Sequence, residues 1–252
     1  MAFVQTTITD GVARIALDRP PLNVLDIGMA RELAAAATAL SAMLDVHAIV
    51  LEANGAAFSA GVDVRDHLPD RGAEMLREFH HACLELWHLD TPTLARVHGA
   101  ALGGGAELTL MCDLVVAGES ATFGFPEIRL GVFPPVAAIL LSRMIPAHIA
   151  ADLILTGRTL SAHEAERAGL VNHAVPDEAL DDAVDAVLAR LCALSPSSLR
   201  VTKQAMRLSR IRAVPDAVGA AESLYLRRLL DDRDAIEGLS AFLEKRPASW
   251  RS

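Results

Sequence analysis

The stretch Gly99-Ala100-Ala101-Leu102-Gly103-Gly104-Gly105-Ala106-Glu107-Leu108 directs the interpretation of this chain. It follows a short apolar run of strand character and continues into a sequence with helical spacing. Consecutive glycines let a backbone approach a ligand closely, and the free N–H groups at the start of a helix favour negative charge. The stretch therefore predicts an oxyanion hole or a phosphate cradle, unless it is only a tight turn between a strand and a helix.

The common phosphate-binding motifs do not fit these glycines. A dinucleotide fingerprint needs G-x-G-x-x-G with an acidic residue after the next strand, and a P-loop ends in Gly-Lys-Ser or Gly-Lys-Thr. Neither pattern occurs here. Glu107 stands one helical turn after Gly104, so its carboxylate can reach the same place as the Gly104 amide. A glutamate near a helix start more often only compensates the helix dipole.

Strands and helices alternate along most of the chain, which predicts an α/β fold. Apolar patterns predict helices over residues 27–44 and 72–88 and strands over residues 12–17, 48–51, 94–97 and 113–117. From residue 176 onward the sequence is helical in character. We expect a core over residues 1–194 and a C-terminal helical segment over residues 195–252. That segment is too small to bury its own apolar face, so it should pack on the core or on another subunit.

The composition describes a compact globular chain without a basic surface. Of the 252 residues, 52% are hydrophobic and 22% are charged, and the formal net charge is −9. That charge repels nucleic acid and anionic membranes, so we expect neither as a partner. The three widely spaced cysteines, Cys83, Cys112 and Cys192, predict neither a disulfide framework nor a metal site. No secretory pattern or run of 18 apolar residues occurs, so we expect a cytoplasmic protein.

A second candidate segment, Phe58-Ser59-Ala60-Gly61-Val62-Asp63, follows the predicted strand over residues 48–51. It approaches the nucleophile elbow G-x-S-x-G, but Ala57 occupies the position of the first glycine, so Ser59 is not expected to be a nucleophile. A loop of small residues at the carboxyl end of a strand is nevertheless where an α/β fold places ligand contacts and donor amides.

The third candidate segment is Phe123-Gly124-Phe125-Pro126-Glu127-Ile128-Arg129-Leu130-Gly131. Apolar neighbours raise the pKa of a carboxyl group toward the range that suits proton donation, which makes Glu127 a candidate acid. The ordinary alternative is a surface glutamate that pairs with Arg129.

Together, these segments resemble the crotonase (enoyl-CoA hydratase/isomerase) superfamily. Its members carry N-A-L-N, F-S-A-G-x-D-L, A-L-G-G-G-x-E-L and F-G-x-P-E-x-x-L-G-x-x-P, and this chain has Leu22-Asn23-Val24-Leu25 and residues 58–64, 101–108 and 123–134. The resemblance continues through residues 237–246 and covers essentially the whole chain. It implies an α/β crotonase-like spiral of ββα units with a C-terminal helical trimerisation segment, assembled as a homotrimer or a dimer of trimers.

The resemblance also implies the residues of the reaction. In the family two backbone amides hold the thioester carbonyl, and the matching positions are Ala60 and Gly104. Such an oxyanion hole stabilises the enolate that forms when a nucleophile adds to the acyl chain. Hydratases of the family use two glutamates, matched here by Glu107 and Glu127. We expect Glu107 to be the base on water and Glu127 the proton donor, with shared roles as the alternative. Many isomerases keep only the second, so the presence of both favours hydration.

The implied substrate is an acyl-CoA thioester. Coenzyme A is then part of the substrate, and we expect no separate cofactor and no metal. Residues that match the family's CoA contacts are Leu22, Ala60, Gly61, Val62, Asp63, Val64, Phe242 and Lys245. The last two match positions that approach the nucleotide in relatives, often from a neighbouring subunit. The ordinary alternative for Lys245 is a solvated helix residue.

The chain departs from most hydratases after Gly131. They continue L-G-x-x-P with G-x-G-G-T-Q-R-L, whereas here Phe133-Pro134 is followed by Pro135-Val136. We expect these four residues to form a rigid, apolar wall of the acyl pocket. The stretch resembles that of cyclohexa-1,5-diene-1-carbonyl-CoA hydratases, a group that serves anaerobic aromatic degradation. This implies a cyclic dienoyl thioester as the substrate.

Other functions stay open at the level of sequence. The same oxyanion hole would serve a straight-chain enoyl-CoA hydratase, an isomerase, a decarboxylase or a thioester hydrolase. A non-enzymatic RNA-binding relative fits least, because the acidic chain has no lysine-rich helical face. His80, His81 and His98 lack an H-E-x-x-H pattern, and we expect them to be packed or solvated.

Overall fold

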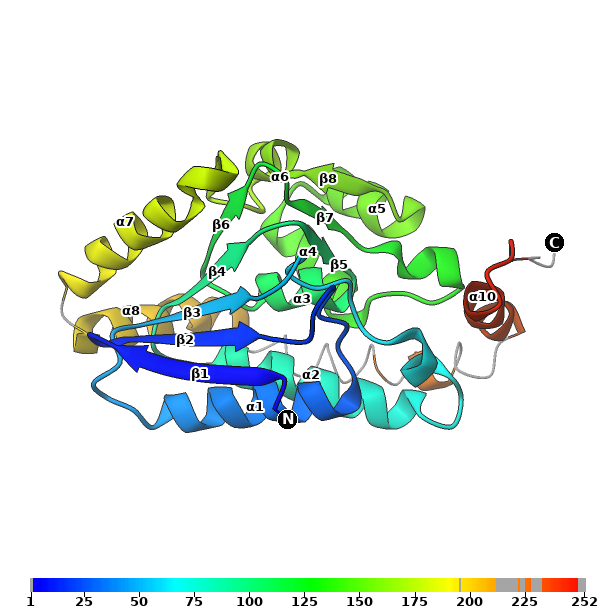
Figure 1. Cartoon of the computed structure of the whole chain (residues 1–252), viewed down its shortest axis with the longest axis horizontal. Helices are drawn as coiled ribbons and strands as arrows, with labels where there is room; N and C mark the ends of the chain where they lie inside the picture. Colours follow the sequence, from blue (N-terminus) through cyan, green and yellow to red (C-terminus); the bar gives the residue numbers. More distant parts are fainter. Residues whose placement is uncertain (1, 195, 212–221, 223–224, 228–232, 249–252) are drawn as a thin grey trace.

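The computed structural model describes residues 2–194, 196–211, 222, 225–227 and 233–248 (Figure 1). Within these residues the main sheet has the strand order β1-β2-β3-β4-β6-β9, and a second sheet has the order β5-β7-β8. The strands are β1 (Val4–Thr9), β2 (Val12–Leu17), β3 (Ala48–Ala53), β4 (Thr93–Val97), β5 (Ala100–Leu102), β6 (Leu114–Gly118), β7 (Thr122–Gly124), β8 (Thr159–Ser161) and β9 (His173–Val175).

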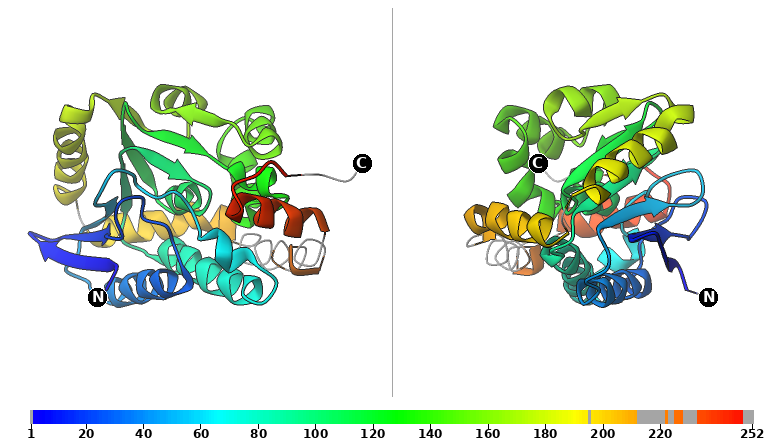
Figure 2. Two further views of the ribbon diagram at one scale, coloured as in Figure 1. Left: turned by 45° about the vertical axis from the view of Figure 1, so that its right-hand side comes forward. Right: turned by 90° about the vertical axis from the view of Figure 1, so that its left-hand side faces the viewer.

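Helices surround both sheets (Figure 2). They are α1 (Ile27–Ser41), α2 (Gly72–His88), α3 (Gly104–Leu110), α4 (Pro135–Met144), α5 (Ala147–Thr156), α6 (Ala162–Ala168), α7 (Leu180–Cys192), α8 (Pro196–Ile211) and α10 (Arg233–Leu243), with 3-10 turns η1 (Val64–His67), η2 (Pro126–Leu130) and η3 (Asp177–Ala179). Helices α1 and α2 lie side by side along the main sheet, and α7 and α10 lie at opposite ends of the molecule (Figure 1).

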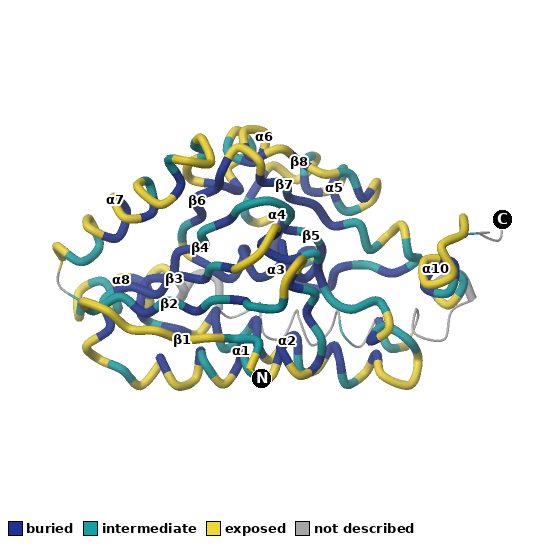
Figure 3. Tube along the Cα trace, viewed as in Figure 1, coloured by how far each residue is buried: buried dark blue, intermediate teal, exposed yellow. Residues whose placement is uncertain are grey.

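Alternate residues of the central strands pack on opposite faces of the main sheet, as the two-residue period of a strand requires. In β3, Ile49 and Leu51 belong to the large core formed with α1 and α2, whereas Ala48 and Val50 belong to an apolar cluster with α7. Strand β3 is parallel to both neighbours, and its two covered faces explain its continuous apolar sequence. Figure 3 shows the buried central strands and the exposed outer sides of the helices.

Short backbone pairings bring the three candidate segments together. Ser59 forms a parallel bridge with Ala101, and Ala101 pairs in parallel with Phe123 between β5 and β7. The Gly103 N–H donates to the carbonyl oxygen of Gly124 over 2.9 Å. Segments that lie far apart in the sequence therefore become neighbours along one set of backbone hydrogen bonds.

The structure confirms the predicted α/β fold and adjusts some of its elements. Helix α2 spans Gly72–His88, as its spacing predicts. Helix α1 ends at Ser41 rather than at Leu44, because the chain turns there toward β3 and leaves Leu44 76% exposed. The second sheet was not predicted, since strands of three residues are too short for a periodic pattern.

A buried cation anchors the C-terminal segment on the core. Lys203 of α8 is 7% exposed, and its Nζ lies 2.6 Å from Asp113 Oδ2 and donates to Thr91 O over 3.0 Å. Helix α10 packs near η1 and η2. Parts of the predicted segment 195–252, including residues 212–221, lie outside the described residues, so the division at residue 194 stays a prediction.

None of the helices in the described part of the chain combines the length and the apolar character that crossing a bilayer requires. The cytoplasmic location stays a prediction.

Candidate active site

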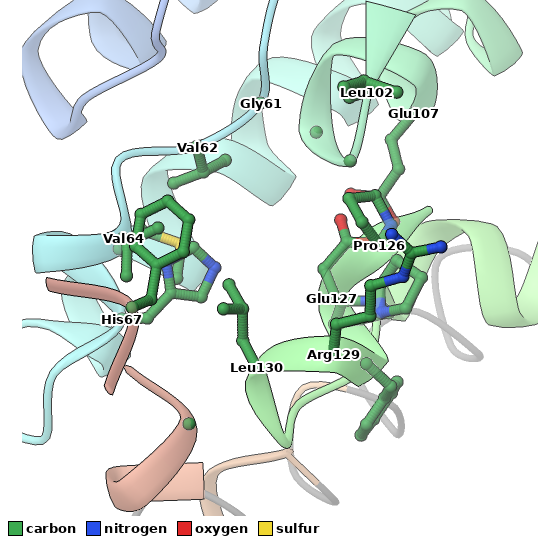
Figure 4. Close-up of a pocket in the computed structure, with 18 of the residues that line it drawn as sticks. Gly61, Val62, Val64, His67, Leu102, Glu107, Pro126, Glu127, Arg129 and Leu130 are labelled. Carbon is green, nitrogen blue, oxygen red and sulfur yellow. The ribbon is translucent and has the colours of Figure 1, made fainter. Parts of the chain in front are cut away.

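A cavity of about 480 Å³ lies where the three candidate segments meet, and residues of α2, the start of α4 and α10 complete its wall. Figure 4 shows Gly61, Val62 and Val64 on one side of it and Glu107 and Glu127 on the other. The cavity therefore joins the glycine-rich turns and both candidate carboxyl groups in a single site.

Glu107 enters this cavity from the first turn of α3. The turn into the helix runs through Gly103 at φ 52° and ψ −126°, a backbone conformation that is essentially restricted to glycine. The Glu107 side chain is buried, and its Oε1 accepts the Ala137 N–H over 2.8 Å. Burial raises the pKa of Glu107, while the N–H donated by Ala137 favours the ionised form of the carboxyl group.

The prolines at the start of α4 do not remove the N–H groups that bond to Glu107. Pro135 occupies the first turn, where its missing N–H has no intrahelical partner to lose. The next free N–H groups, those of Val136 and Ala137, face the Glu107 carboxyl group. The two prolines thus form part of the cavity wall, while the N–H groups that follow them can still bond to the buried Glu107 carboxylate.

Glu127 approaches the same place from η2. A Cβ atom built on Gly103 would lie 2.6 Å from Glu127 Oε1, so the carboxyl group rests against that glycine. Its Oε2 is buried and has no hydrogen-bond partner among the described residues. Burial raises the pKa of Glu127 well above its usual range, and the charge of Glu107 raises it further. Within the described residues Glu127 forms no ion pair with Arg129, so the surface alternative is wrong.

Burial raises the pKa of both glutamates, but their neighbours differ. The N–H donated by Ala137 stabilises an ionised Glu107, and an ionised Glu107 in turn keeps the proton on Glu127. A base and an acid facing one cavity can take a proton from water and give a proton to carbon.

The structure corrects one expected oxyanion donor. The Ala60 N–H donates to the carbonyl oxygen of Leu22 over 2.8 Å, so it is not available to a ligand. The Gly61 N–H is also engaged, because it donates to Ser59 Oγ over 3.1 Å. The Ser59 hydroxyl group in turn donates to Asn23 O. Ser59 therefore holds the loop in place, which agrees with the expectation that it is not a nucleophile.

The Val62 N–H, unlike the Ala60 N–H, has no backbone partner among the described residues. The Leu25 N–H donates to Gly61 O, and the Asp63 N–H donates to Leu25 O. The N–H of Val62, which lies between these two bonded residues, therefore points away from Leu25. Within the described part of the chain, neither the Val62 N–H nor the Gly104 N–H donates a backbone hydrogen bond. A Cβ atom on Gly104 would lie 2.7 Å from Val62 Cγ2, which shows how closely the two residues approach. Two unbonded amides thus lie together in the cavity wall.

Most of the predicted ligand contacts line this cavity. They are Ala60, Gly61, Val62, Val64 and Phe242 for CoA, and Phe133, Pro134 and Pro135 for the acyl group. Val136 is a correction: its side chain is 1% exposed and packs in the hydrophobic core, because α4 turns it away from the cavity.

Three predicted CoA contacts lie outside the cavity lining and stay predictions. Leu22 is 44% exposed. Lys245 is also exposed. The Asp63 carboxylate accepts hydrogen bonds from Arg65. The residue after Lys245, Arg246, lines the cavity instead and pairs with Glu237.

Two polar residues of the site were missed by sequence reasoning. His80 is 3% exposed and Tyr225 is 1% exposed, and both line the cavity. His80 lies on the apolar face of α2 beside Leu76 and Cys83, and a polar residue on such a face was a usable signal. Tyr225 is the single tyrosine of the chain, but nothing in its local sequence indicated a site.

Comparisons with known proteins agree over almost the whole chain. The sequence model of the enoyl-CoA hydratase/isomerase family matches residues 7–252. The cyclohexa-1,5-dienecarbonyl-CoA hydratase of Thauera aromatica is 38% identical over 95% of this chain and 92% of its own length. The protein named "Probable enoyl-CoA hydratase echA8" in Mycobacterium bovis is also 38% identical, over 93% of this chain and 92% of its own.

Solved structures share the architecture. An enoyl-CoA hydratase from Mycobacterium avium subsp. paratuberculosis K-10 superposes with a TM-score of 0.90 at 27% identity, covering 100% of this chain and 99% of that one. An enoyl-CoA hydratase/isomerase from Xanthobacter autotrophicus Py2 superposes with a TM-score of 0.87 at 30% identity, covering 99% of each chain.

Proposed function

Because the chain belongs to the enoyl-CoA hydratase/isomerase family, we propose that it adds water to a cyclic dienoyl thioester, cyclohexa-1,5-diene-1-carbonyl-CoA. The family establishes the broader activity: the protein is a hydro-lyase of the enoyl-CoA hydratase type, acting on acyl-CoA thioesters. The crotonase fold expected from the sequence is confirmed by the same comparisons.

One observation carries the choice of hydration. Glu107 and Glu127 face a single cavity together with the unbonded amides of Val62 and Gly104. Double-bond migration needs one group that moves a proton, whereas hydration needs a base for water and an acid for carbon. Two buried carboxyl groups fit the second requirement, because one accepts the Ala137 N–H and its charge raises the pKa of the other.

The reaction follows from these positions. The Val62 and Gly104 N–H groups bind the thioester oxygen, and Glu107 takes a proton as the water oxygen bonds to the β-carbon. The electron pair of the double bond moves to the thioester oxygen and forms an enolate, which the two amides stabilise. Glu127 then gives its proton to a carbon conjugated with the enolate. Loss of one such amide donor typically costs about 3 kcal/mol of transition-state stabilisation.

The cavity wall supports a ring rather than a straight chain. Phe133 and the two prolines after it line the acyl end, and the Phe133 and Tyr225 rings lie 5.6 Å apart between centroids. Proline at two successive positions restricts the backbone of this wall, and aromatic surface packs well against a flat ring. The equal identity to the Thauera and Mycobacterium proteins does not separate the two substrates, so a straight-chain enoyl thioester is the alternative.

The exposed apolar side of α10 supports assembly into a trimer or a dimer of trimers. Ile236, Phe242 and Leu243 are 37%, 56% and 42% exposed, and Phe242 also lines the cavity. A neighbouring subunit would cover this surface. Sedimentation velocity is expected to give three or six times the 26.8 kDa chain mass, and a monomer at micromolar concentration would contradict this part of the proposal.

The substrate is tested by incubating the protein with cyclohexa-1,5-diene-1-carbonyl-CoA and, separately, with crotonyl-CoA. Mass spectrometry then detects the gain of one water. We expect a higher kcat/KM with the cyclic thioester. A higher value with crotonyl-CoA would favour the straight-chain alternative, and water gain with neither would refute hydration.

The base is tested with Glu107→Gln, which keeps the side-chain shape and removes the charge. We expect hydration to fall by about 10²–10⁴-fold. Glu119→Gln is the matched control, because Glu119 is exposed and pairs with His163 outside the cavity. A Glu107→Gln enzyme within tenfold of the control would show that another group activates the water.

A further inference from the structure

Two buried polar atoms in the cavity wall have no part in the reaction described so far. His80 Nε2 and Tyr225 Oη are each buried, and neither has a hydrogen-bond partner among the described residues. Leaving such an atom unpaired typically costs about 1–3 kcal/mol. Both side chains line the same cavity as Glu107 and Glu127, so a ligand in that cavity is a candidate partner for the two atoms.

The orientation of the His80 ring is set from outside the cavity. His80 Nδ1 lies 3.2 Å from Glu222 Oε2. Because an ionised carboxylate only accepts hydrogen bonds, this contact favours the tautomer of the ring that carries its hydrogen on Nδ1. This contact lowers the pKa of Glu222. In a neutral ring with its hydrogen on Nδ1, the remaining nitrogen Nε2 is a hydrogen-bond acceptor.

Tyr225 offers the complementary group. Its ring packs against Phe133, and burial, together with the charge of Glu107, raises the pKa of its hydroxyl group. The tyrosine therefore keeps its hydrogen and can donate it. One acceptor and one donor near the two glutamates match a hydroxyl group, which donates one hydrogen bond and accepts others.

We propose that His80 and Tyr225 bind a hydroxyl group of the acyl moiety, with His80 Nε2 accepting its hydrogen and Tyr225 Oη donating to its oxygen. This inference rests on the proposed hydration and extends it from the reacting water to the hydroxyl group of the product. A saturated hydrocarbon at the same place leaves both buried atoms unpaired. The pair therefore makes the site prefer a hydroxyacyl-CoA to the matching acyl-CoA.

Binding measurements test this preference without using turnover. Isothermal titration gives the Kd of the full-length protein for 3-hydroxybutyryl-CoA, 4-hydroxybutyryl-CoA and butyryl-CoA. The first carries the hydroxyl group that hydration creates, and the second carries one that a substrate could bring. We expect wild type to prefer a hydroxyacyl-CoA, and Tyr225→Phe to reduce that preference about tenfold, because one good hydrogen bond is lost while the packing on Phe133 is kept.

Two substitutions of His80 distinguish the contribution of its Nδ1 atom from that of its Nε2 atom. His80→Asn places an amide nitrogen close to the position of Nδ1 and keeps the contact with Glu222, but removes Nε2. His80→Gln places its amide group close to the position of Nε2. We expect Asn to reduce the preference by about tenfold and Gln to restore part of it. His81→Asn is the matched control, because His81 is the exposed neighbour on the same helix and pairs with Glu85.

The outcomes are distinct. A preference for 3-hydroxybutyryl-CoA that the Tyr225 and His80 variants lose assigns the pair to the product hydroxyl group. The same loss for 4-hydroxybutyryl-CoA alone assigns it to a substrate hydroxyl group. Unchanged ratios of Kd in folded variants overturn the inference, whether or not the protein hydrates the cyclic thioester.

Discussion

The substitution Gly103→Ala tests the position of the Glu127 carboxyl group. A Cβ atom at residue 103 would lie 2.6 Å from Glu127 Oε1 and 3.3 Å from its Cδ. Ordinary van der Waals contact begins at 3.4 Å, so the carboxyl group must retreat by roughly 0.8 Å. Because a displacement of about 1 Å can slow a reaction by about 10²-fold, we expect kcat to fall about 10²-fold with a small change in KM.

The same substitution strains the backbone. Gly103 adopts φ 52° and ψ −126°, and a residue with a Cβ atom in such a region costs about 1–3 kcal/mol. The hydration rate and the free energy of unfolding of the variant must therefore both be measured. The gain of one water, followed by mass spectrometry, reports hydration, and urea denaturation reports the free energy of unfolding.

Gly169→Ala is the matched control. Gly169 also has a positive φ, 83°, but its Cβ atom would meet no other atom within 4 Å. This variant is expected to lose about 1 kcal/mol of stability and to keep its rate.

A double-mutant cycle isolates the catalytic effect. If Gly103→Ala acts by moving the Glu127 carboxyl group, it should cost little in a Glu127→Gln background. A folded Gly103→Ala enzyme with kcat within fivefold of wild type would refute the assigned position. An equal loss in both backgrounds would also refute it.

Three further predictions follow from pKa shifts and buried hydrogen bonds. The hydration rate should fall as pH rises through the raised pKa of Glu127, because Glu127 then loses the proton that it donates. The Glu107→Gln substitution removes a charge that helps to raise this pKa. The alkaline fall in the residual rate of that variant should therefore occur at lower pH. An alkaline fall at the same pH as in wild type contradicts this coupling. Asn23→Ala should lower the free energy of unfolding by about 2–4 kcal/mol, because the buried Asn23 side chain bonds to the backbone of Arg19, Asn54 and Ala57; a loss below 1 kcal/mol in urea denaturation would argue against it. Lys203→Met should destabilise the protein by about 2 kcal/mol, less than for a fully buried pair, because the Asp113 carboxylate is 33% exposed. Equal thermal stability of wild type and variant would count against an anchoring role.

Local sequence patterns were sufficient to predict the helices and turns that depend only on neighbouring residues. The spacing over residues 72–88 predicted α2, because one apolar face recurs every three or four residues. The glycines at residues 103–105 predicted the turn into α3, because that backbone conformation excludes side chains. Glu107 and Glu127 were also identified in sequence, since each follows such a turn or a proline at a fixed distance.

The choice of oxyanion donor could not be made in the same way. Ala60 and Val62 are both small or aliphatic residues in one loop, and each has an N–H group. Only the fold shows that Leu22 O occupies the Ala60 donor while the pairing with Leu25 leaves the Val62 donor unbonded. The partners lie more than thirty residues upstream, beyond any local pattern.

Short motifs and periodicity were sufficient to predict the family, the α/β fold class, the glycine turns and the two carboxyl residues. The three-dimensional fold was needed to show which amides are unbonded, that Val136 packs in the core, and that His80 and Tyr225 line the cavity. Whether an amide or an imidazole can meet a ligand depends on which distant residues have already bonded to it or buried it, and folding makes that selection.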